Sequence, residues 1–209
     1  MGKITLLQKQ KRNRQRMNLH IDGEYYCSLD AEVALRHGLF EGQELDCADF
    51  AMLIGEDEWR SAMDTALRYL AQARTTWEIR EKLKKKDYND ELIQEILDKL
   101  DDWGYLDDLS YAAALIKDRT AGGKSRREIG EVLYRKGVPR EIADAAWEQV
   151  SPDTERDAAR LYAEKRLKDP GDRVAVAKLK NTMYRKGFPG EMIDDALSGL
   201  DAKEEDGDA

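Results

Sequence analysis

The sequence contains little of the chemistry that marks secreted proteins, metalloproteins or hydrolases. Only two of its 209 residues are cysteine, two are histidine and four are proline. Cys27 and Cys47 lack a CxxC spacing, so we expect free thiols in a reducing compartment. His20 and His37 indicate no metal site, and neither has a nucleophile beside it. We therefore interpret both histidines as structural.

Long hydrophobic runs are also missing. No apolar stretch approaches the roughly 20 residues that cross a bilayer, and the N-terminus lacks the apolar core of a signal peptide. These absences predict a cytoplasmic protein without a membrane partner. A hydrophobic share of 41% is enough for a buried core, and the length fits one domain or two small ones.

Charge is plentiful but unevenly distributed. The net charge of -8 argues against a protein that holds nucleic acid by bulk electrostatics alone. The first sixteen residues contain no acid but six basic residues, Lys3, Lys9, Lys11, Arg12, Arg14 and Arg16. The acidic end "DAKEEDGDA", 201–209, has no apolar periodicity, and it predicts a disordered tail.

A repeat dominates the rest of the chain. "LYRKGVP" from Leu133 recurs fifty residues later as "MYRKGFP" from Met183, and a weaker copy begins fifty residues earlier at Leu83. Apolar positions keep this register while polar ones drift, which predicts a repeated structural unit. The further matched positions are Tyr88, Val138 and Phe188; Leu92, Ile142 and Met192; Leu97, Trp147 and Leu197; and Leu100, Val150 and Leu200.

The helical period predicts three units of three helices each. We expect these helices at about 58–73, 76–86, 90–102, 108–119, 126–136, 139–150, 154–168, 173–186 and 190–200. The fold class is therefore mainly α, with tandem three-helix repeats in a solenoid-like series and a small N-terminal β-hairpin or β-sheet segment. The expected divisions are an N-terminal segment 1–55, repeats at 56–104, 105–151 and 152–200, and the tail 201–209.

The N-terminal segment contains a hairpin signal. Asp22-Gly23 suits the positive φ angles of a type I′ turn, and Ile4–Leu7 predicts a third strand. A helix follows through Arg36 and stops near Gly38. Asp46 predicts the cap of another helix, which we expect Gly55 to break.

The repeat boundaries carry helix-capping signals. Thr75 with Glu78 and Ser125 with Glu128 have capping-box spacing, and the two boxes are themselves fifty residues apart. The third repeat lacks this pair, so Asp172 is its predicted cap. At the opposite helix ends, Gly137 and Gly187 predict left-handed closures, each followed by a proline that starts the next helix.

Basic residues cluster in the second helix of each repeat. A cation near a helix C-terminus offsets the helix dipole, but that effect does not require a lysine run in one repeat and Arg-Lys pairs in the next two. Two interpretations stay open, helix capping with solubility or a contact surface. The candidate partner-binding residues are Lys84, Lys85, Arg126, Arg127, Arg135, Lys136, Arg185 and Lys186. Reversal of Arg126 and Arg127 to Glu, in a helix's first turn, should leave stability equal or higher.

Catalytic and cofactor signals are weak. "AGGKS" resembles a P-loop, but Asp118 stands where the P-loop glycine belongs, and a helix leads in. Asp107 and Asp108 could suggest a metal pair, yet acids at a helix start are favoured by the dipole. We predict no enzyme activity, no cofactor and no metal.

The repeats resemble a known family. "ALRYLAQARTTWEIREKL", "WGYLDDLSYAAALI" and "SRREIGEVLYRKGV" are similar to the RecX regulatory protein family, and Gly104–Asp108 is the most specific piece. The resemblance covers about 58–200. It is weaker in the third repeat, where "KDPGDR" precedes the second helix, and in the N-terminal hairpin.

The resemblance implies a function. RecX-like proteins are non-enzymatic cytoplasmic regulators that bind the groove of the RecA–DNA filament and usually inhibit its recombinase and ATPase activities. The implied setting is DNA repair, DNA recombination and the SOS response, with DNA met mainly through the filament. The alternative is direct binding of single-stranded nucleic acid, which the basic segments favour and the net charge does not.

Overall fold

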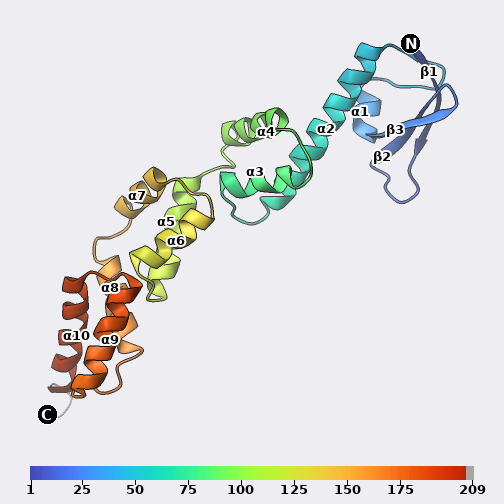
Figure 1. Ribbon diagram of the computed structural model, residues 1–209. Coiled ribbons are helices and arrows are strands. Elements are labelled where there is room, and N and C mark those ends of the chain that lie inside the picture. Colours follow the sequence, from blue (N-terminus) through green and yellow to red (C-terminus); the bar gives the residue numbers. More distant parts are fainter. Residues whose placement is uncertain (206–209) are drawn as a thin grey trace. The chain divides into compact units, whose positions relative to one another are not determined.

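Strands occur only near the N-terminus in the part of the chain that the computed structural model describes, residues 1–205. Figure 1 traces the elements along the chain. They form two units, one of residues 1–71 and 82–99 and the other of 72–81 and the residues from 100 onward.

The first unit contains a small antiparallel sheet. Its strands are β1 (Gly2–Lys9), β2 (Arg16–Ile21), β3 (Glu24–Asp30) and β4 (Glu44–Leu45), in the order β3-β2-β1-β4. Asp22 and Gly23 join β2 to β3 with φ angles of 50° and 91°. These positive angles confirm the predicted hairpin turn. The predicted third strand is also confirmed as β1.

Two helices cover this sheet. The helices α1 (Ala31–Arg36) and α2 (Cys47–Tyr69) bury Val33 and Leu53 against sheet residues such as Ile4 and Leu19. Asp46 begins α2 with a complete capping box, as predicted. The expected break at Gly55 is wrong, because α2 continues through it. A glycine costs a helix interior only about 1 kcal/mol relative to alanine, and the cap and the buried apolar face of α2 outweigh that loss.

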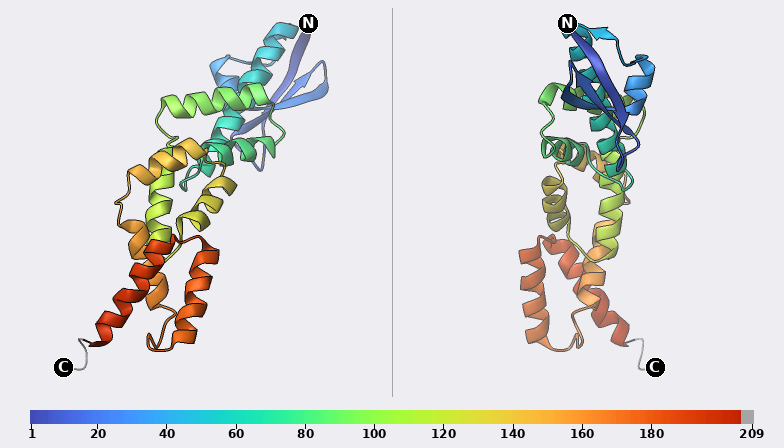
Figure 2. Two further views of the ribbon diagram at one scale, coloured as in Figure 1. Left: turned by 60° about the vertical axis from the view of Figure 1, so that its left-hand side comes forward. Right: turned by 90° about the vertical axis from the view of Figure 1, so that its right-hand side faces the viewer.

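The three repeats are mainly helical, as predicted, but the first helix of the first repeat is the C-terminal part of α2 and not a separate helix at about 58–73. The helices after α2 are α3 (Thr76–Lys84), α4 (Asp90–Asp102), α5 (Asp108–Ala121), α6 (Arg126–Arg135), α7 (Arg140–Glu148), α8 (Thr154–Glu164), α9 (Arg173–Lys186) and α10 (Gly190–Glu205). In the second unit α5 packs against α7 and α8, and α8 packs against α10 (Figure 2). The helix α10 reaches Glu205, inside the segment predicted to be disordered; 206–209 lie outside the described residues.

The fifty-residue register is also the register of the core. Leu83, Leu133 and Met183 are buried to 1% exposure or less. Leu133 belongs to one apolar cluster with Ile116 and Ala146, and Met183 belongs to another with Tyr162, Phe188 and Ile193. Buried, half-buried and exposed residues follow one another in the same order over 131–139 and 181–189. The predicted equivalence of these positions is therefore confirmed.

The predicted helix boundaries have the expected chemistry. Ser125 and Glu128 form a reciprocal capping box, and Asp172 caps α9. Gly137 and Gly187 close their helices with φ angles of 69° and 93°. No described helix combines the length and the hydropathy that a membrane span requires.

Candidate partner-binding surface

The eight candidate basic residues fall into both units. Lys84 and Lys85 belong to the first unit, and the other six belong to the second. Lys84 pairs with Asp90 at 3.1 Å. Lys85 is exposed and makes no ion pair among the described residues.

Lys136 and Lys186 lie at junctions between repeats. Lys136 Nζ lies 2.6 Å from the Glu78 carboxylate, and Lys186 Nζ lies 2.6 Å from the Glu128 carboxylate. Each lysine ends the second helix of its own repeat, and each glutamate starts the second helix of the preceding repeat. The lysines therefore join neighbouring repeats, a role that neither sequence interpretation included.

The capping hydroxyls take part in the same junctions. Thr75 accepts a hydrogen bond from the Glu78 backbone N–H and donates its hydroxyl to the Lys136 carbonyl at 2.6 Å. Ser125 does the same with Glu128 and the Lys186 carbonyl, at 2.5 Å for the second bond. A hydroxyl can donate and accept at once, whereas a carboxylate can only accept. The junction therefore requires serine or threonine at this cap.

Acids from the next repeat complete each junction. The Asp108 carboxylate accepts from the Thr76 backbone N–H at 2.8 Å, so Asp108 binds the preceding repeat while Asp107 caps α5. Glu155 is placed near the Arg126 backbone in the second junction, where burial, the larger effect, raises the pKa of Glu155 while this neighbour lowers it. The predicted capping role of Asp107 is confirmed, and the second role of Asp108 is new.

The two glycines are needed for close approach as well as for backbone angle. A Cβ atom on Gly137 would lie 2.1 Å from Trp77 Cγ, and one on Gly187 would lie 2.6 Å from Arg127 Cβ. Trp77 and Arg127 are again equivalent residues, each in the first turn of the second helix. "RKG" is therefore largely a docking motif between repeats.

Electrostatics favour the charged form of Glu128 at one junction and of Lys136 at the other. Burial acts to raise the pKa of Glu128, but hydrogen bonds from Lys186, the Ser125 backbone and Lys124 outweigh it and lower that pKa. At the other junction, the hydrogen bond with Glu78 raises the pKa of Lys136.

Arg126 and Arg127 also have partners within the protein. Arg126 lies 3.4 Å from Asp144 and stacks over the Trp147 ring at 5.0 Å. Arg127 pairs with Glu131 at 3.5 Å. Both side chains are still at least half exposed, so a partner could contact them.

Arg135 and Arg185 are the equivalent cations that point outward. Both are exposed, and neither makes an ion pair with a described residue. Beside them stand Tyr134, which is 83% exposed, and Tyr184, which is 48% exposed. Sequence reasoning missed these tyrosines, although each directly follows the buried residue of a helical stripe and so lies off the buried face.

The comparisons with known proteins agree with this architecture. Residues 2–46 match the regulatory protein RecX N-terminal domain, and 62–100, 107–146 and 153–197 match the first, second and third three-helix domains of RecX. The chain belongs to the RecX regulatory protein family. Relatives named regulatory protein RecX include one from Clostridium tetani, 30% identical over 96% of this chain and 95% of its own length. Another, from Bacillus licheniformis, is 33% identical over 99% and 81%.

Solved RecX structures share the fold. A crystal structure of regulatory protein RecX aligns with a TM-score of 0.68 at 28% identity, over 93% of this chain and all of that one. RecX from Lactobacillus salivarius aligns with a TM-score of 0.64 at 28% identity, over 70% of this chain and 99% of that one. The family is one of regulators, and among the described residues no cluster of three or more metal-ligating side chains occurs.

Proposed function

We propose that this RecX family member binds the RecA recombinase–DNA filament in the cytoplasm and inhibits its recombinase and ATPase activities during DNA repair, DNA recombination and the SOS response. It acts as a non-enzymatic regulator without a cofactor. Family membership supports the regulatory role, and the RecA partner follows from the family resemblance.

One observation supports a repeated contact surface. Tyr134 and Arg135 are exposed sequence neighbours in the second unit, and Tyr184 and Arg185 are exposed at the equivalent positions fifty residues later. Tyrosine and arginine are enriched among the residues that dominate interface energies. A filament repeats its own surface, so two equal pairs on a repeat protein can gain affinity through multivalency.

The candidate cations then divide by task. Lys136 and Lys186 hold the repeats together, so their substitution would alter binding indirectly. Arg135 and Arg185 can contact the partner directly, while Arg126, Arg127, Lys84 and Lys85 contribute positive charge that steers association.

The test is RecA-filament ATPase and strand exchange, with and without the protein. We expect inhibition by the parent, and about tenfold weaker inhibition by a Tyr134→Ala, Tyr184→Ala double variant, since each hot-spot tyrosine contributes about 1 kcal/mol or more. A second double variant, Arg135→Glu with Arg185→Glu, should mainly slow association. Its control, Arg156→Glu with Arg173→Glu, carries the same charge change on other exposed arginines of the second unit. Equal inhibition by all variants would reject this surface.

Direct binding of single-stranded nucleic acid is the second candidate. The observation that favours it is the β1–β2 loop region, where Lys9, Lys11, Arg12 and Arg14 are exposed and make no ion pair with described residues. DNA binding without RecA, with affinity that falls steeply as salt rises, would support it. A nucleotide-dependent role at Lys124 is disfavoured, because this lysine pairs with Glu128 and its loop joins α5 to α6; an ATP-binding assay tests that.

A further inference from the structure

A groove of about 530 Å³ lies in the first unit, outside the repeats' candidate residues. The β1–β2 hairpin, α1 and the α1–β4 connection contribute apolar side chains to its lining, namely Leu7, Met17, Leu35 and Leu39. Leu35 is 79% exposed, which is unusual for a leucine beside a core that buries Val33 and Ala34 completely or nearly so. The same groove is lined by two exposed cations, Lys9 and Arg14.

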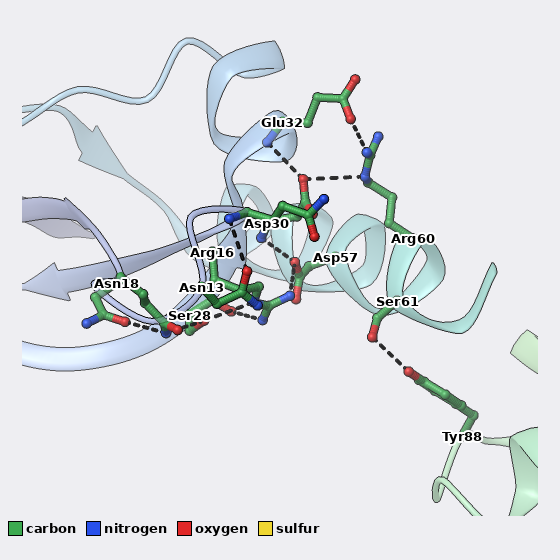
Figure 3. Close-up of polar contacts among 12 residues, drawn as sticks. Asn13, Arg16, Asn18, Ser28, Asp30, Glu32, Asp57, Arg60, Ser61 and Tyr88 are labelled. Atoms are coloured by element: carbon green, nitrogen blue, oxygen red, sulfur yellow. Dashed lines mark hydrogen bonds and ion pairs between the residues drawn. The ribbon is translucent and has the colours of Figure 1, made fainter. Parts of the chain in front are cut away.

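The charged side chains that line the groove are three cations and two carboxylates, so their net charge is 3 − 2 = +1. Arg60 is neutralised by Glu32 and by Asp30, whose carboxylate lies 3.6 Å from Arg60 Nε (Figure 3). Lys9 and Arg14 make no ion pair with any residue that the structure describes. The groove therefore combines an aliphatic lining with two cations, Lys9 and Arg14, that pair with no described carboxylate, although the second carboxylate on Arg60 leaves the net charge of the lining at +1.

The loop that carries Arg14 is held in place. The Gln10 backbone N–H donates to the Arg16 carbonyl at 2.9 Å, and the Ala31 N–H at the start of α1 donates to the Gln15 carbonyl at 2.7 Å. Beneath the loop, Arg16 donates to Asp57 of α2 at 2.9 Å and to Ser28 of β3, as Figure 3 shows. A groove that is ordered before binding loses less entropy when a ligand enters.

We propose that this groove binds an acidic peptide segment of a partner protein, with an aliphatic side chain seated on the leucines and flanking carboxylates paired with Lys9 and Arg14. The volume falls within the range of ligand pockets, about 300–1,000 Å³. Carboxylates form charge-assisted hydrogen bonds with arginine, often through two parallel contacts. The aliphatic lining supplies affinity, and the cations supply orientation and association rate.

Nucleic acid fits the groove less well. Single-stranded DNA and RNA bind through bases stacked on aromatic rings beside a basic track, and the described groove lining contains no aromatic side chain. A peptide can contact both the aliphatic lining and the two cations, whereas a phosphate backbone can contact only the cations. This proposal is independent of the filament proposal, since no residue of the groove belongs to the repeats' candidate set.

The test uses a fluorescein-labelled peptide in which two adjacent leucines are flanked on each side by glutamates. Two comparison peptides replace the leucines by serine or the glutamates by glutamine, and an oligothymidylate is the nucleic-acid probe. We expect saturable anisotropy binding of the first peptide, about tenfold weaker binding of each comparison peptide, and weaker binding of the oligothymidylate.

Variants locate the site. Lys9→Glu with Arg14→Glu should weaken binding of the first peptide at least about tenfold, and Leu35→Ser, at an exposed position, should weaken it without altering the melting temperature. The control Lys3→Glu with Lys86→Glu makes the same charge change outside the groove and should bind like the parent. The proposal is overturned if the first peptide does not bind saturably, or if its binding is unaffected by the groove variants. It is also overturned if the oligothymidylate binds more tightly than the first peptide, and if that binding is lost in the Lys9→Glu, Arg14→Glu variant but kept in Leu35→Ser.

Discussion

The ammonium group of Lys186 lies 2.6 Å from the carboxylate of Glu128, which belongs to the preceding repeat. The contact is one of a set, because the Lys186 carbonyl accepts from Ser125 and the next residue, Gly187, fits beneath Arg127. Lys136 and Gly137 meet Glu78, Thr75 and Trp77 in the same way. The C-terminal end of the second helix in one repeat thus contacts the N-terminal cap of the second helix in the preceding repeat.

The junction predicts that a serine and an aspartate are not interchangeable at position 125. Both are good N-caps in isolated helices, but Ser125 is fully buried and its hydroxyl also donates to the Lys186 carbonyl. Ser125→Asp keeps the acceptor, loses the donor and places a carboxylate against a carbonyl oxygen. We expect a loss of about 1–3 kcal/mol in the free energy of unfolding, measured by urea denaturation.

The matched control is Asp172→Ser in α9, whose side chain only accepts, from Val174 and Ala175. That change should stay within about 0.5 kcal/mol of the parent. Equal effects at the two caps would contradict the dual role of the Ser125 hydroxyl.

The Glu128 pair predicts a dependence of stability on pH. Because the folded pKa of Glu128 is lowered, its contribution to stability is present above the unfolded pKa and is lost as pH falls through the folded pKa. Glu128→Gln keeps the capping box but removes the charge. The parent should exceed this variant by about 1 kcal/mol at neutral pH.

That gap should close as pH falls from about 5 to about 3, because an unperturbed glutamate titrates near 4.3. Urea unfolding across this window measures it. Glu131→Gln is the control, since the Glu131 side chain makes a single ion pair among the described residues, an exposed one with Arg127. The effect of this control on the free energy of unfolding should stay below about 0.5 kcal/mol. A gap for Glu128 that does not change with pH would show that its charge contributes nothing.

The close approach at Gly137 predicts opposite effects for one substitution at two glycines. Gly137→Ala requires a positive φ and brings Cβ within 2.1 Å of Trp77, so it should destabilise the protein by more than about 1 kcal/mol. Gly130 lies inside α6, and no neighbouring atom would lie within 4 Å of a Cβ atom at this position. Gly130→Ala should stabilise by about 0.5–1 kcal/mol. Thermal melts of both variants check this, and a Gly137→Ala protein as stable as the parent would contradict the docking geometry.

Local chemistry explains which parts of the fold could be predicted from the sequence. Helix starts and stops depend on residues within one turn, so the spacing of Ser125 and Glu128 was sufficient to predict a cap. The contact from Lys186 to that cap depends on how whole repeats dock, which spacing within a helix does not encode. Gly55 was misjudged because its small local cost is overridden by the packing of α2.

The sequence did contain a signal of the docking. The hydroxyl–glutamate pair is present in the first two repeats, and the lysine–glycine pair that meets it is present in the next two. Asp87 replaces the glycine in the first repeat and takes the same left-handed conformation, with φ of 62°. The third repeat has Ala175 and Lys178 in place of the box. The first repeat therefore lacks the lysine–glycine pair, and the last repeat lacks the hydroxyl–glutamate pair. This difference between the first and last repeats indicates that the two pairs meet across the junctions.

The candidate surface was harder to predict, because a basic residue at a helix end has the same local pattern whether it meets a partner or a neighbouring repeat. Only the three-dimensional structure separates Lys136, which is paired, from Arg135, which is exposed. The tyrosines beside the exposed arginines were overlooked because only the apolar positions of the shared register were considered, and Tyr134 and Tyr184 stand next to that register.

Reversal of Arg126 and Arg127 to Glu is the last prediction, and the structure changes its expected outcome. The helix dipole favours acids in the first turn of α6 by about 0.3–1 kcal/mol, so the sequence alone predicts equal or higher stability. However, Arg126 pairs with Asp144 and stacks over Trp147, and Glu155 lies close enough for the charge of Arg126 to oppose the rise that burial causes in its pKa. A glutamate at 126 would lose the pair and the cation–π contact and would stand near two carboxylates.

We therefore expect the double reversal to lower the free energy of unfolding by about 1–2 kcal/mol, since the lost cation–π contact and the new repulsion exceed the dipole gain. Arg126→Gln with Arg127→Gln separates charge from contact, because it removes both cations without adding repulsion. Added salt should recover part of the stability of the Glu variant and little of the Gln variant, since screening weakens repulsion between exposed charges. If the Glu variant instead melts at or above the temperature of the parent at low salt, the dipole outweighs the contacts of Arg126. Any loss of the proposed RecA inhibition in that stable variant would then be assigned to the missing positive surface alone.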